Sequence, residues 1–184
     1  MDPCPDQPPQ APSAHTNPCS PAGRAPRSLG LRILSDGTWL YQGSPIRRTA
    51  LVRLFASVLR HEADGSYWLV TPVERGRIEV DDAPFVAVDL AAEGAGPDQV
   101  VRLRTNLDEW LTLGPDHPLR LRRAADQPAE AGPVPYVEVR GGLEARLARP
   151  VYYELVELAE ERRDGERQRF GVWSDGAFFA LDGA

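Results

Sequence analysis

Two stretches of the chain follow one plan, and this doubling constrains the fold more than any other feature of the sequence. Residues 36–72 read DGTWLYQGSPIRRTALVRLFASVLRHEADGSYWLVTP, and residues 136–181 read YVEVRGGLEARLARPVYYELVELAEERRDGERQRFGVWSDGAFFAL. Each stretch reads as a strand, an arginine, an amphipathic helix, an Asp-Gly turn and an aromatic strand. Because self-similarity within a chain is the signature of repeated structure, the sequence predicts two related units joined in one body.

The predicted helices lie at equivalent places in the two stretches. The first runs roughly from Arg47 to His61, and the second opens with Pro150 in its first turn, where a missing N–H costs little. Large apolar residues recur in both at intervals of three and four, as one buried stripe requires. The turns Asp64-Gly65 and Asp164-Gly165 are predicted to end the helices, since glycine accepts a positive φ.

Strand-forming runs separated by short turns fill most of the chain after residue 28, about ten of them in all. Such short connections leave little room for parallel crossovers. The sequence therefore predicts an α+β fold of two similar units, each with one helix packed on mainly antiparallel strands. We expect residues 29–98 to form the first repeat unit and residues 99–184 the second. Residues 1–28 hold eight prolines and are expected to be a disordered leader.

Charge and composition argue against several functions. A net charge of −6 disfavours nucleic acid as a partner, because binding it usually needs a basic face. All 21 basic residues are arginine, so the chain has neither a Schiff-base lysine nor a phosphate-loop lysine. No apolar run reaches the roughly 18 residues of a membrane span, and the leader lacks the pattern of a secretory signal. Since both cysteines, Cys4 and Cys19, lie in that leader, we expect a cytoplasmic protein without a membrane partner.

No motif in the sequence points to a metal or a cofactor, and none is predicted. The three histidines lack the spacing of zinc ligands. A carboxylate site for Mg²⁺ or Ca²⁺ around Glu79, Asp81 and Asp82 is a weaker interpretation than acidic residues solvating a turn. The chain also lacks a nucleophile elbow and the setting of a dinucleotide fingerprint, so no catalytic residue is predicted.

Three carboxylates, Glu74, Asp82 and Glu144, are candidates for ligand binding. Glu74 follows an otherwise apolar strand ending. A carboxylate on apolar ground needs a compensating partner, and arginines are abundant in this chain. We favour structural salt bridges for these residues. The alternative is a pocket in which an arginine and a carboxylate together hold a polar ligand.

Two arginines, Arg48 and Arg149, occupy comparable places just before the two helices. Positive charge there opposes the helix dipole by about 0.3–1 kcal/mol, so the side chains are expected to have another use. One use is to bind an anion beside the helix N-terminus, where N–H groups are free. The alternative, which we favour, is that they pair with carboxylates of the adjoining unit and lock the two repeats together.

The run from Trp39 to Phe85 resembles a bacterial family known as domain of unknown function 1285 (DUF1285). The matching phrases are DGTWLYQGSPI, LVRLFASVLRHEADGSYWLVTPVE and IEVDDAPF, with TNLDEW, YVEVRGGLEARLARPVYYELV and GVWSDGAFF later in the chain. The resemblance implies a small cytoplasmic proteobacterial protein with an internally repeated α+β fold. It implies no particular reaction, and a regulatory or signalling role is the function it suggests.

The leading hypothesis is a non-catalytic ligand-binding or regulatory module, whose partner is a small polar ligand or another protein, because ligands often occupy the cleft between duplicated units. The alternatives are an enzyme that acts on a small polar substrate through Glu74, Asp82 or Glu144, and a structural homodimer. If the protein is an enzyme, we expect a buried, unpaired carboxylate in a large cavity. A binding module predicts a groove lined by arginines and aromatic side chains, with its carboxylates already paired. A homodimer predicts a broad exposed apolar patch.

Overall fold

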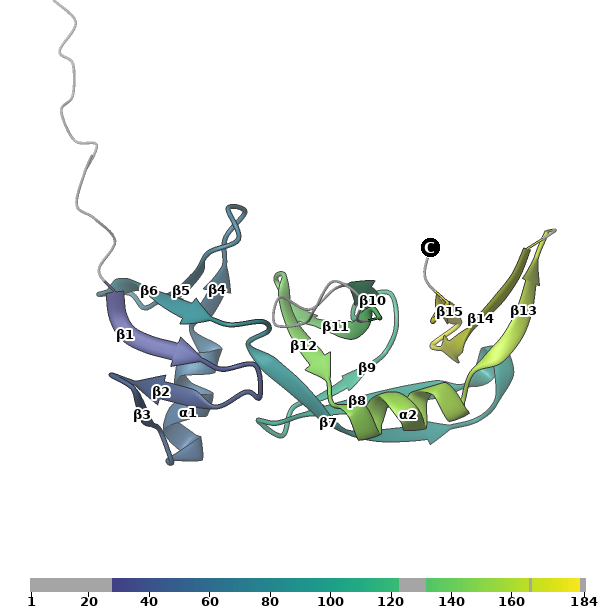
Figure 1. Cartoon of the computed structure of the whole chain (residues 1–184), viewed down its shortest axis with the longest axis horizontal. Coiled ribbons are helices and arrows are strands. Elements are labelled where there is room, and N and C mark those ends of the chain that lie inside the picture. The colour runs from purple at the N-terminus through teal and green to yellow at the C-terminus, as the bar shows by residue number, and fades with distance from the viewer. Residues whose placement is uncertain (1–27, 123–131, 166, 183–184) are drawn as a thin grey trace, which may run out of the picture.

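The structure is a computed structural model that describes residues 28–122, 132–165 and 167–182. It contains three β-sheets and two α-helices within those residues, arranged along one direction (Figure 1). The leader predicted to be disordered lies outside the described residues except for Ser28, and so do Cys4 and Cys19.

The first unit is a six-stranded sheet with one helix. Its strands are β1 (Ser28–Ile33), β2 (Trp39–Tyr41), β3 (Ser44–Pro45), β4 (Leu59–His61), β5 (Tyr67–Val70) and β6 (Arg75–Val80). They lie in the order β3-β2-β1-β6-β5-β4, in which the central pair β1 and β6 is parallel and the other pairs are antiparallel. Helix α1 (Thr49–Ser57) connects β3 to β4 and buries Val52 and Ala56.

The second unit repeats this strand order. Its strands are β7 (Phe85–Glu93), β8 (Val100–Thr105), β9 (Trp110–Thr112), β10 (Leu119–Arg122), β11 (Val134–Arg140) and β12 (Leu143–Leu147). They lie in the order β10-β11-β12-β7-β8-β9, again with the first and last strands as a parallel central pair. A short 3₁₀ helix, η1 (Gly96–Asp98), joins β7 to β8.

A third, smaller sheet follows the second unit. Helix α2 (Arg149–Glu157) begins directly after β12 and leads into β13 (Glu160–Asp164), β14 (Arg167–Ser174) and β15 (Ala177–Ala180), which form an antiparallel sheet in chain order. In Figure 1, α2 runs from the second sheet towards the third, and it packs against β7 and β14. The hydroxyl of Ser174 accepts from the Val101 N–H at 2.9 Å and donates to the Leu113 carbonyl at 2.5 Å, which ties β14 to the second unit.

The prediction of an α+β fold built from two similar units is confirmed, although α1 lies between the third and fourth strands of its sheet and α2 follows the sixth strand of its sheet. Both repeated stretches form a hairpin, a helix and a second hairpin: β2/β3, α1 and β4/β5 in the first, and β11/β12, α2 and β13/β14 in the second. The second hairpin of the first unit returns to the same sheet. Its counterpart in the second unit forms the separate third sheet.

Both helices are shorter than the sequence predicts. They end at Ser57 and Glu157, and the short strands β4 and β13 follow before the Asp-Gly turns. The prediction that these turns end helices is therefore wrong, because each is the turn of a hairpin. Leu59 shows the reason: its apolar side chain fits the helical stripe, but it is fully buried as a strand residue opposite Leu69. Antiparallel pairing thus prevails over helix extension at this point.

The last strand of the first sheet, β6, does not pair with the first strand of the second sheet, β7, so the two units divide between these strands. The sequence analysis expects the second unit to begin at residue 99, whereas β7 pairs with β8 and β12. The second half of β7 is largely exposed and ends at Glu93, just before a polar loop. For this reason the sequence places the end of a unit there.

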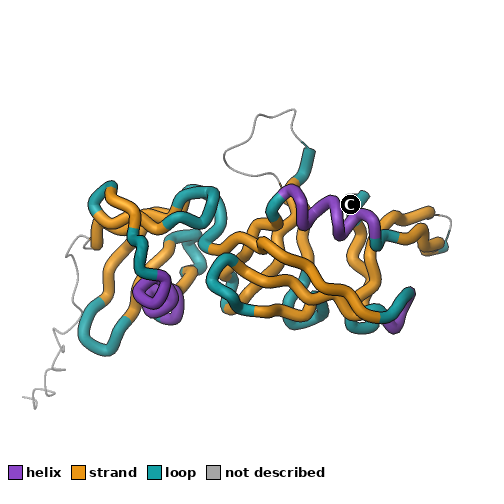
Figure 2. The backbone as a smooth tube through the Cα atoms, turned by 90° about the horizontal axis from the view of Figure 1, so that it is seen from below, coloured by secondary structure: helices purple, strands orange, loops and turns teal. Residues whose placement is uncertain are grey.

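One apolar cluster runs through both units, so they form one body. It includes Ile33 and Trp39 in the first unit and Phe85, Val137 and Leu155 beyond it. Figure 2 shows the two sheets beside each other, with α1 and α2 at their surfaces. Within the residues described, the structure has no helix that is long and apolar enough to span a membrane.

Hydrogen bonds cross the boundary between the units and form a polar seam, which we define as Arg53, Ala56, Leu107, Glu109 and Arg140. The Arg53 guanidinium donates to the Leu107 carbonyl at 3.0 Å, and Arg140 donates to the Ala56 carbonyl at 3.2 Å. Arg140 also makes two bonds to the Glu109 carboxylate, at 2.7 and 2.9 Å. The seam therefore joins α1 to the second unit through guanidinium groups.

Candidate functional site

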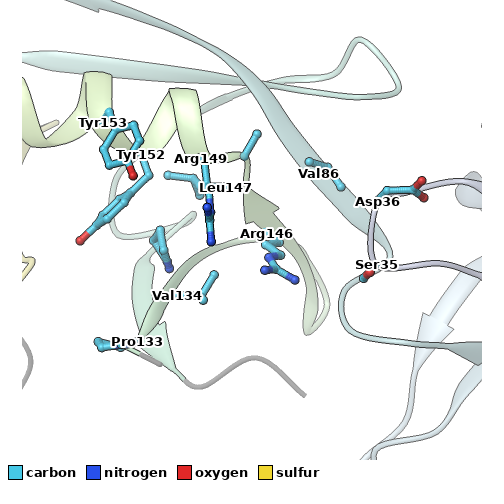
Figure 3. Close-up of a pocket in the computed structure, with 13 residues that line it drawn as sticks. Ser35, Asp36, Val86, Pro133, Val134, Arg146, Leu147, Arg149, Tyr152 and Tyr153 are labelled. Atoms are coloured by element: carbon cyan, nitrogen blue, oxygen red, sulfur yellow. The ribbon is translucent and has the colours of Figure 1, made fainter. Parts of the chain in front are cut away.

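A cleft of about 690 Å³ lies where the turn after β1 faces the start of α2 (Figure 3). It is lined by Ser35 and Asp36 of the first unit and by Val86, Gly132, Pro133, Val134, Pro135, Arg146, Leu147, Ala148, Arg149, Tyr152 and Tyr153 of the second. Figure 3 shows Arg146 and Arg149 near its middle, with the two tyrosines on one side and Ser35 and Asp36 on the other. Its volume falls in the range typical of small-molecule sites, about 300–1,000 Å³.

The Asp82 carboxylate lies behind one wall of this cleft, in the connection between the two sheets. Its side chain is 0% exposed. The Tyr136 hydroxyl donates to it, lying 2.8 Å from both carboxylate oxygens, and Arg146 donates to Oδ2 at 3.2 Å. A buried carboxylate is tolerated when charge and hydrogen-bonding capacity are both satisfied, and these two partners satisfy them. Asp82 thereby holds the Arg146 guanidinium at the edge of the cleft.

Arg122 connects Asp82 to Glu144. It binds the Glu144 Oε2 through Nη2 at 2.9 Å and Nε at 3.1 Å, and its Nη1 lies 3.9 Å from Asp82. Its guanidinium carbon also lies 3.7 Å from the centre of the Tyr136 ring, a cation–π distance. We call Asp82, Arg122, Tyr136, Glu144 and Arg146 the buried ion cluster, after Asp82 and Tyr136, which are buried; the other three side chains are partly exposed.

Burial and charge in this cluster act on two tyrosines. Burial, and then the hydrogen bond to Asp82, raise the pKa of the Tyr136 hydroxyl well above its ordinary value, so it stays a proton donor. Burial raises the pKa of Tyr67 in β5 as well, with the nearby charge of Glu144 as the next cause. Tyr67 stacks on His61, its partner in the neighbouring strand β4, at 4.7 Å between ring centres.

Arg149 is the most available cation of the cleft. It is the first residue of α2, its side chain is exposed, and among the described residues it has no ion pair or side-chain hydrogen bond. The N-cap residue Ala148 provides no side-chain hydrogen bond and Pro150 has no N–H, so the N–H groups of Arg149 and Val151 are those of the first turn that no cap side chain satisfies. A guanidinium and the uncapped start of a helix thus lie together at the cleft.

The structure brings some of the predicted site residues together and separates others. Asp82 and Glu144 share Arg122, and Arg149 lines the cleft beside Arg146. Arg48 is the exposed N-cap of α1 and does not line this cleft. Glu74 lies in the turn between β5 and β6 and lines a different cavity, next to α1.

The cross-unit locking that we favoured for Arg48 and Arg149 is not seen. Within the described parts of the chain, neither arginine forms an ion pair. The guanidinium groups that join the units are instead those of Arg53 and Arg140, which lie within α1 and at the end of β11. They are better placed because their elements lie at the boundary itself.

Sequence reasoning missed most residues of the buried ion cluster, including Arg122, Tyr136 and Arg146. One signal was present: Glu144 and Arg146 are two positions apart in a strand, so their side chains point to the same face. Their partners come from β10, β11 and the segment after β6, and no local pattern links these segments.

The cleft offers cationic and aromatic groups rather than groups suited to proton transfer. Asp36 is the one carboxylate among the described residues that line it; this side chain is exposed and accepts a hydrogen bond from the Thr38 N–H at 2.8 Å. In the described parts of the chain, no three His, Cys, Asp or Glu side chains gather in a way that would hold a metal ion. The arrangement suits a ligand with an anionic group and an apolar or aromatic part.

Two family models match consecutive parts of the chain. The N-terminal domain of DUF1285, a domain of unknown function, matches residues 23–83, and the C-terminal domain of DUF1285, a protein of unknown function, matches residues 84–181. The two models therefore meet at the division between the sheets. None of the curated proteins matches the chain.

Two crystal structures of DUF1285 family proteins resemble this one. The protein from Silicibacter pomeroyi DSS-3 is 47% identical with a TM-score of 0.75, and the match covers 84% of this chain and 80% of that chain. The protein from Shewanella baltica OS155 is 29% identical with a TM-score of 0.52, and the match covers 70% of this chain and 91% of that chain. Neither is described by a function, so the function of this chain stays uncharacterised. The resemblance inferred from the sequence is confirmed, and the chain belongs to the DUF1285 family.

Proposed function

We propose that this protein is a non-catalytic binding module that holds a small anionic ligand in the cleft between its two units. The observation that carries the proposal is the place of Arg149, a cleft-lining guanidinium without an ion pair among the described residues. An arginine that is held near open helix N–H groups suits a phosphate or carboxylate, because it offers a planar set of donors.

Arg146 supports the same ligand class. Asp82 and Tyr136 lie behind it, and its bond to Asp82 restricts the orientation of its guanidinium. A pre-oriented side chain loses less conformational entropy when a ligand binds. Because Arg146 already bonds to Asp82, it contributes a fixed positive field, and Arg149 is the residue expected to contact the anion directly.

The apolar lining defines the rest of the ligand. Tyr152 and Tyr153 lie in the first turns of α2, and Pro133 and Val134 face them across the cleft (Figure 3). Aromatic rings and prolines accept flat apolar groups. We therefore expect a ligand with an aromatic or similarly flat apolar part joined to its anionic group.

The two alternative functions have weaker support. An enzyme acting through Asp82 or Glu144 would need an accessible carboxylate, whereas both are bound to arginines. A homodimer would need one broad apolar patch, whereas the exposed large apolar residues occur on several elements. They are Tyr41, Leu54, Val73, Val88, Trp110, Tyr153 and Phe170.

We further propose a regulatory or signalling role in the bacterial cytoplasm. The support is the pairing of two similar units around a cleft, together with the composition of the chain and the cationic and aromatic side chains among the described residues that line the cleft. Ligand contacts with Ser35 on one unit and α2 on the other would change how firmly the units are held together. A protein partner could read that change.

The test compares Arg149→Ala with Arg48→Ala by isothermal titration with phenyl phosphate. Phenyl phosphate should bind the unaltered protein, and benzyl alcohol, which lacks the anion, should not. Arg149→Ala should weaken binding by about tenfold or more, because a hydrogen bond to a charged group contributes about 1.5–3 kcal/mol. Arg48→Ala should leave the affinity unchanged, since Arg48 has the same place before the other helix but does not line the cleft. Equal losses in both variants, or no binding of phenyl phosphate, would contradict the proposal.

A further inference from the structure

A second cavity, of about 460 Å³, lies between α1 and the face of the first sheet. It is lined by Leu29, Leu31, Tyr41, Ile46, Leu51, Phe55, Val58, Leu69, Thr71 and Glu74. Its walls come from both layers of the unit: Leu51 and Phe55 belong to α1, and Leu31 and Leu69 belong to β1 and β5. It is thus an opening between packed layers rather than a flat surface patch.

Most polar groups of this lining already have partners. The Thr71 hydroxyl donates to the Glu74 carbonyl at 2.9 Å and accepts from the Glu74 N–H at 3.0 Å, so it closes its own turn. Among the described residues that line the cavity, Glu74 is the one charged residue, and it is not without a partner. Apart from the Tyr41 hydroxyl, the lining therefore offers few hydrogen bonds in return for the hydration that a polar ligand would lose.

The floor of the cavity depends on a glycine. Gly76 in β6 is buried, and a Cβ atom there would lie 2.2 Å from the Leu29 Cγ, so the Leu29 side chain lies directly over the strand backbone. The register of β1 against β6 shifts between Ser28 and Arg32, and Gly30 within that shift has a φ of +66°. Irregular pairing of this kind re-aims side chains, here the apolar ones of β1.

An exposed aromatic side chain lies at the edge of the cavity. Tyr41, which lines the cavity, is 50% exposed. An apolar molecule can therefore contact its ring on the way in.

We propose that this cavity binds a neutral, apolar small molecule. An apolar cavity accepts apolar guests, because their binding removes apolar surface of both guest and cavity from water. The ligand is neutral because no cationic side chain among the described residues lines the cavity, while the Glu74 carboxylate at one end disfavours a negatively charged head group. The ligand is small because the space lies between α1 and the sheet, and a partner helix would need an open groove instead.

This site is separate from the cleft between the units. Neither Arg146 nor Arg149 lines it, and none of its lining residues belongs to the second unit. The inference therefore does not rest on the proposed function, and Arg149→Ala serves as an additional variant that should not change apolar binding.

The experiment titrates the full chain with N-phenyl-1-naphthylamine, a neutral dye whose fluorescence rises in apolar surroundings. Decanol should displace the dye, and decanoate should do so at least about tenfold less well, because its head group is charged. Val58→Phe, which places a larger side chain in the cavity wall, should weaken dye binding by about tenfold or more. Leu54→Phe, the same kind of change on the exposed side of α1, should leave it unchanged.

Methyl NMR spectra of the unaltered protein locate the bound molecule. Decanol should shift the methyl signals of Leu31, Leu51 and Leu69 and leave those of Val134 in the other cleft in place. The proposal is overturned if the dye does not bind, or if Val58→Phe binds it as well as Leu54→Phe does. It is also overturned if sedimentation shows that the chain dimerises and that the dye competes with the dimer, since the occupant would then be a second copy.

Discussion

Asp82 carries a full charge into the interior, and the residues around it explain how the fold tolerates that charge. The Tyr136 hydroxyl and the Arg146 guanidinium both bond to it, and Arg122 lies slightly farther away. Exchanging such a set for apolar residues is often tolerated, but removing one member leaves the others unsatisfied. The stability effect of a single substitution here is therefore larger than the energy of one ordinary hydrogen bond.

Tyr136→Phe should destabilise the protein by about 1–3 kcal/mol, because it leaves the buried Asp82 without its hydroxyl donor while keeping the ring. Urea denaturation measures this free energy of unfolding. Tyr153→Phe is the matched control, since Tyr153 is 62% exposed and should change stability little.

The unaltered protein and Tyr136→Phe should respond differently to alkaline pH. The folded state raises the pKa of Tyr136 above its unfolded value of about 10, so the contribution of its hydroxyl is complete below pH 10. That contribution is lost as the pH rises from there through the folded pKa. The stability difference between the unaltered protein and Tyr136→Phe should therefore shrink above about pH 10. A difference that stays constant to higher pH would argue against a neutral, buried hydroxyl at this position.

At the level of elements, the third sheet depends on close contact between its strands. Gly171 in β14 faces β15, where a Cβ atom would lie 2.3 Å from the Phe179 carbonyl oxygen and 2.9 Å from the Ala180 Cα. Both are backbone atoms, so the strands would have to move apart. No other residue type fits this position without that movement.

Gly171→Ala should therefore destabilise the third sheet, by roughly 1–3 kcal/mol as expected for overpacking. Hydrogen exchange should show faster exchange in β14 and β15 than in the two larger sheets. Gly132→Ala is the control, because a Cβ atom at Gly132 meets nothing within 4 Å and its φ is not in the left-handed region. If both variants melt like the unaltered protein, the close approach of β15 to Gly171 is wrong.

The elements also show how far sequence patterns reach. The hairpins around Gly37 and Gly176 and the strand pair β11 and β12 fit the general prediction of strands separated by short turns, because turn residues and alternation are local signals. The predicted helix ends are wrong, because Leu59 and Glu160 belong to strands that pair with the strands beyond the next turn. A helical pattern of apolar residues cannot show that the last residues of the predicted helix pair with a later strand in a hairpin.

For the whole molecule, the polar seam determines whether the two units behave as one. Arg140 makes two bonds to the Glu109 carboxylate and one to the Ala56 carbonyl at the end of α1. Interfaces between domains that rely on polar contacts commonly permit relative motion. Here the seam is continuous with an apolar cluster that includes residues of both units, so the two contributions act together.

Arg140→Met should weaken the coupling between units, because Met keeps much of the apolar stem and removes the donors. Calorimetry should show a broader or divided transition and a loss of about 1–3 kcal/mol. Arg120→Met is the control: Arg120 is 61% exposed and lies 3.5 Å from Glu138, and surface pairs of this kind contribute about 0–1 kcal/mol. A single sharp transition in Arg140→Met would show that the apolar cluster alone joins the units.

At this scale the sequence predicts the doubling but not the site. The resemblance between residues 36–72 and 136–181 is visible because it is repetition within one chain, whereas the sheet orders relate β1–β6 to β7–β12 instead. The buried ion cluster joins β10, β11, β12 and the segment that carries Asp82, and these meet through sheet pairing that sequence spacing does not encode. Arg149 could be identified from the sequence because a positive charge at the start of a helix opposes the helix dipole, which is unusual and visible locally.

The parallel pair at the centre of each sheet governs the order in which this chain can mature during synthesis. Ile33 finds its neighbour Val80 only after all the intervening residues have been made, and Ala87 waits in the same way for Leu147. Pairings between distant positions slow folding, because the intervening loop must close first. The outer hairpins can form early on the ribosome, whereas the central parallel strands of each sheet pair last. Among the strand edges that are paired in the folded sheets, the inner edges of β1 and β7 therefore wait for partners far along the chain, and these are the segments that a nascent-chain chaperone would need to protect.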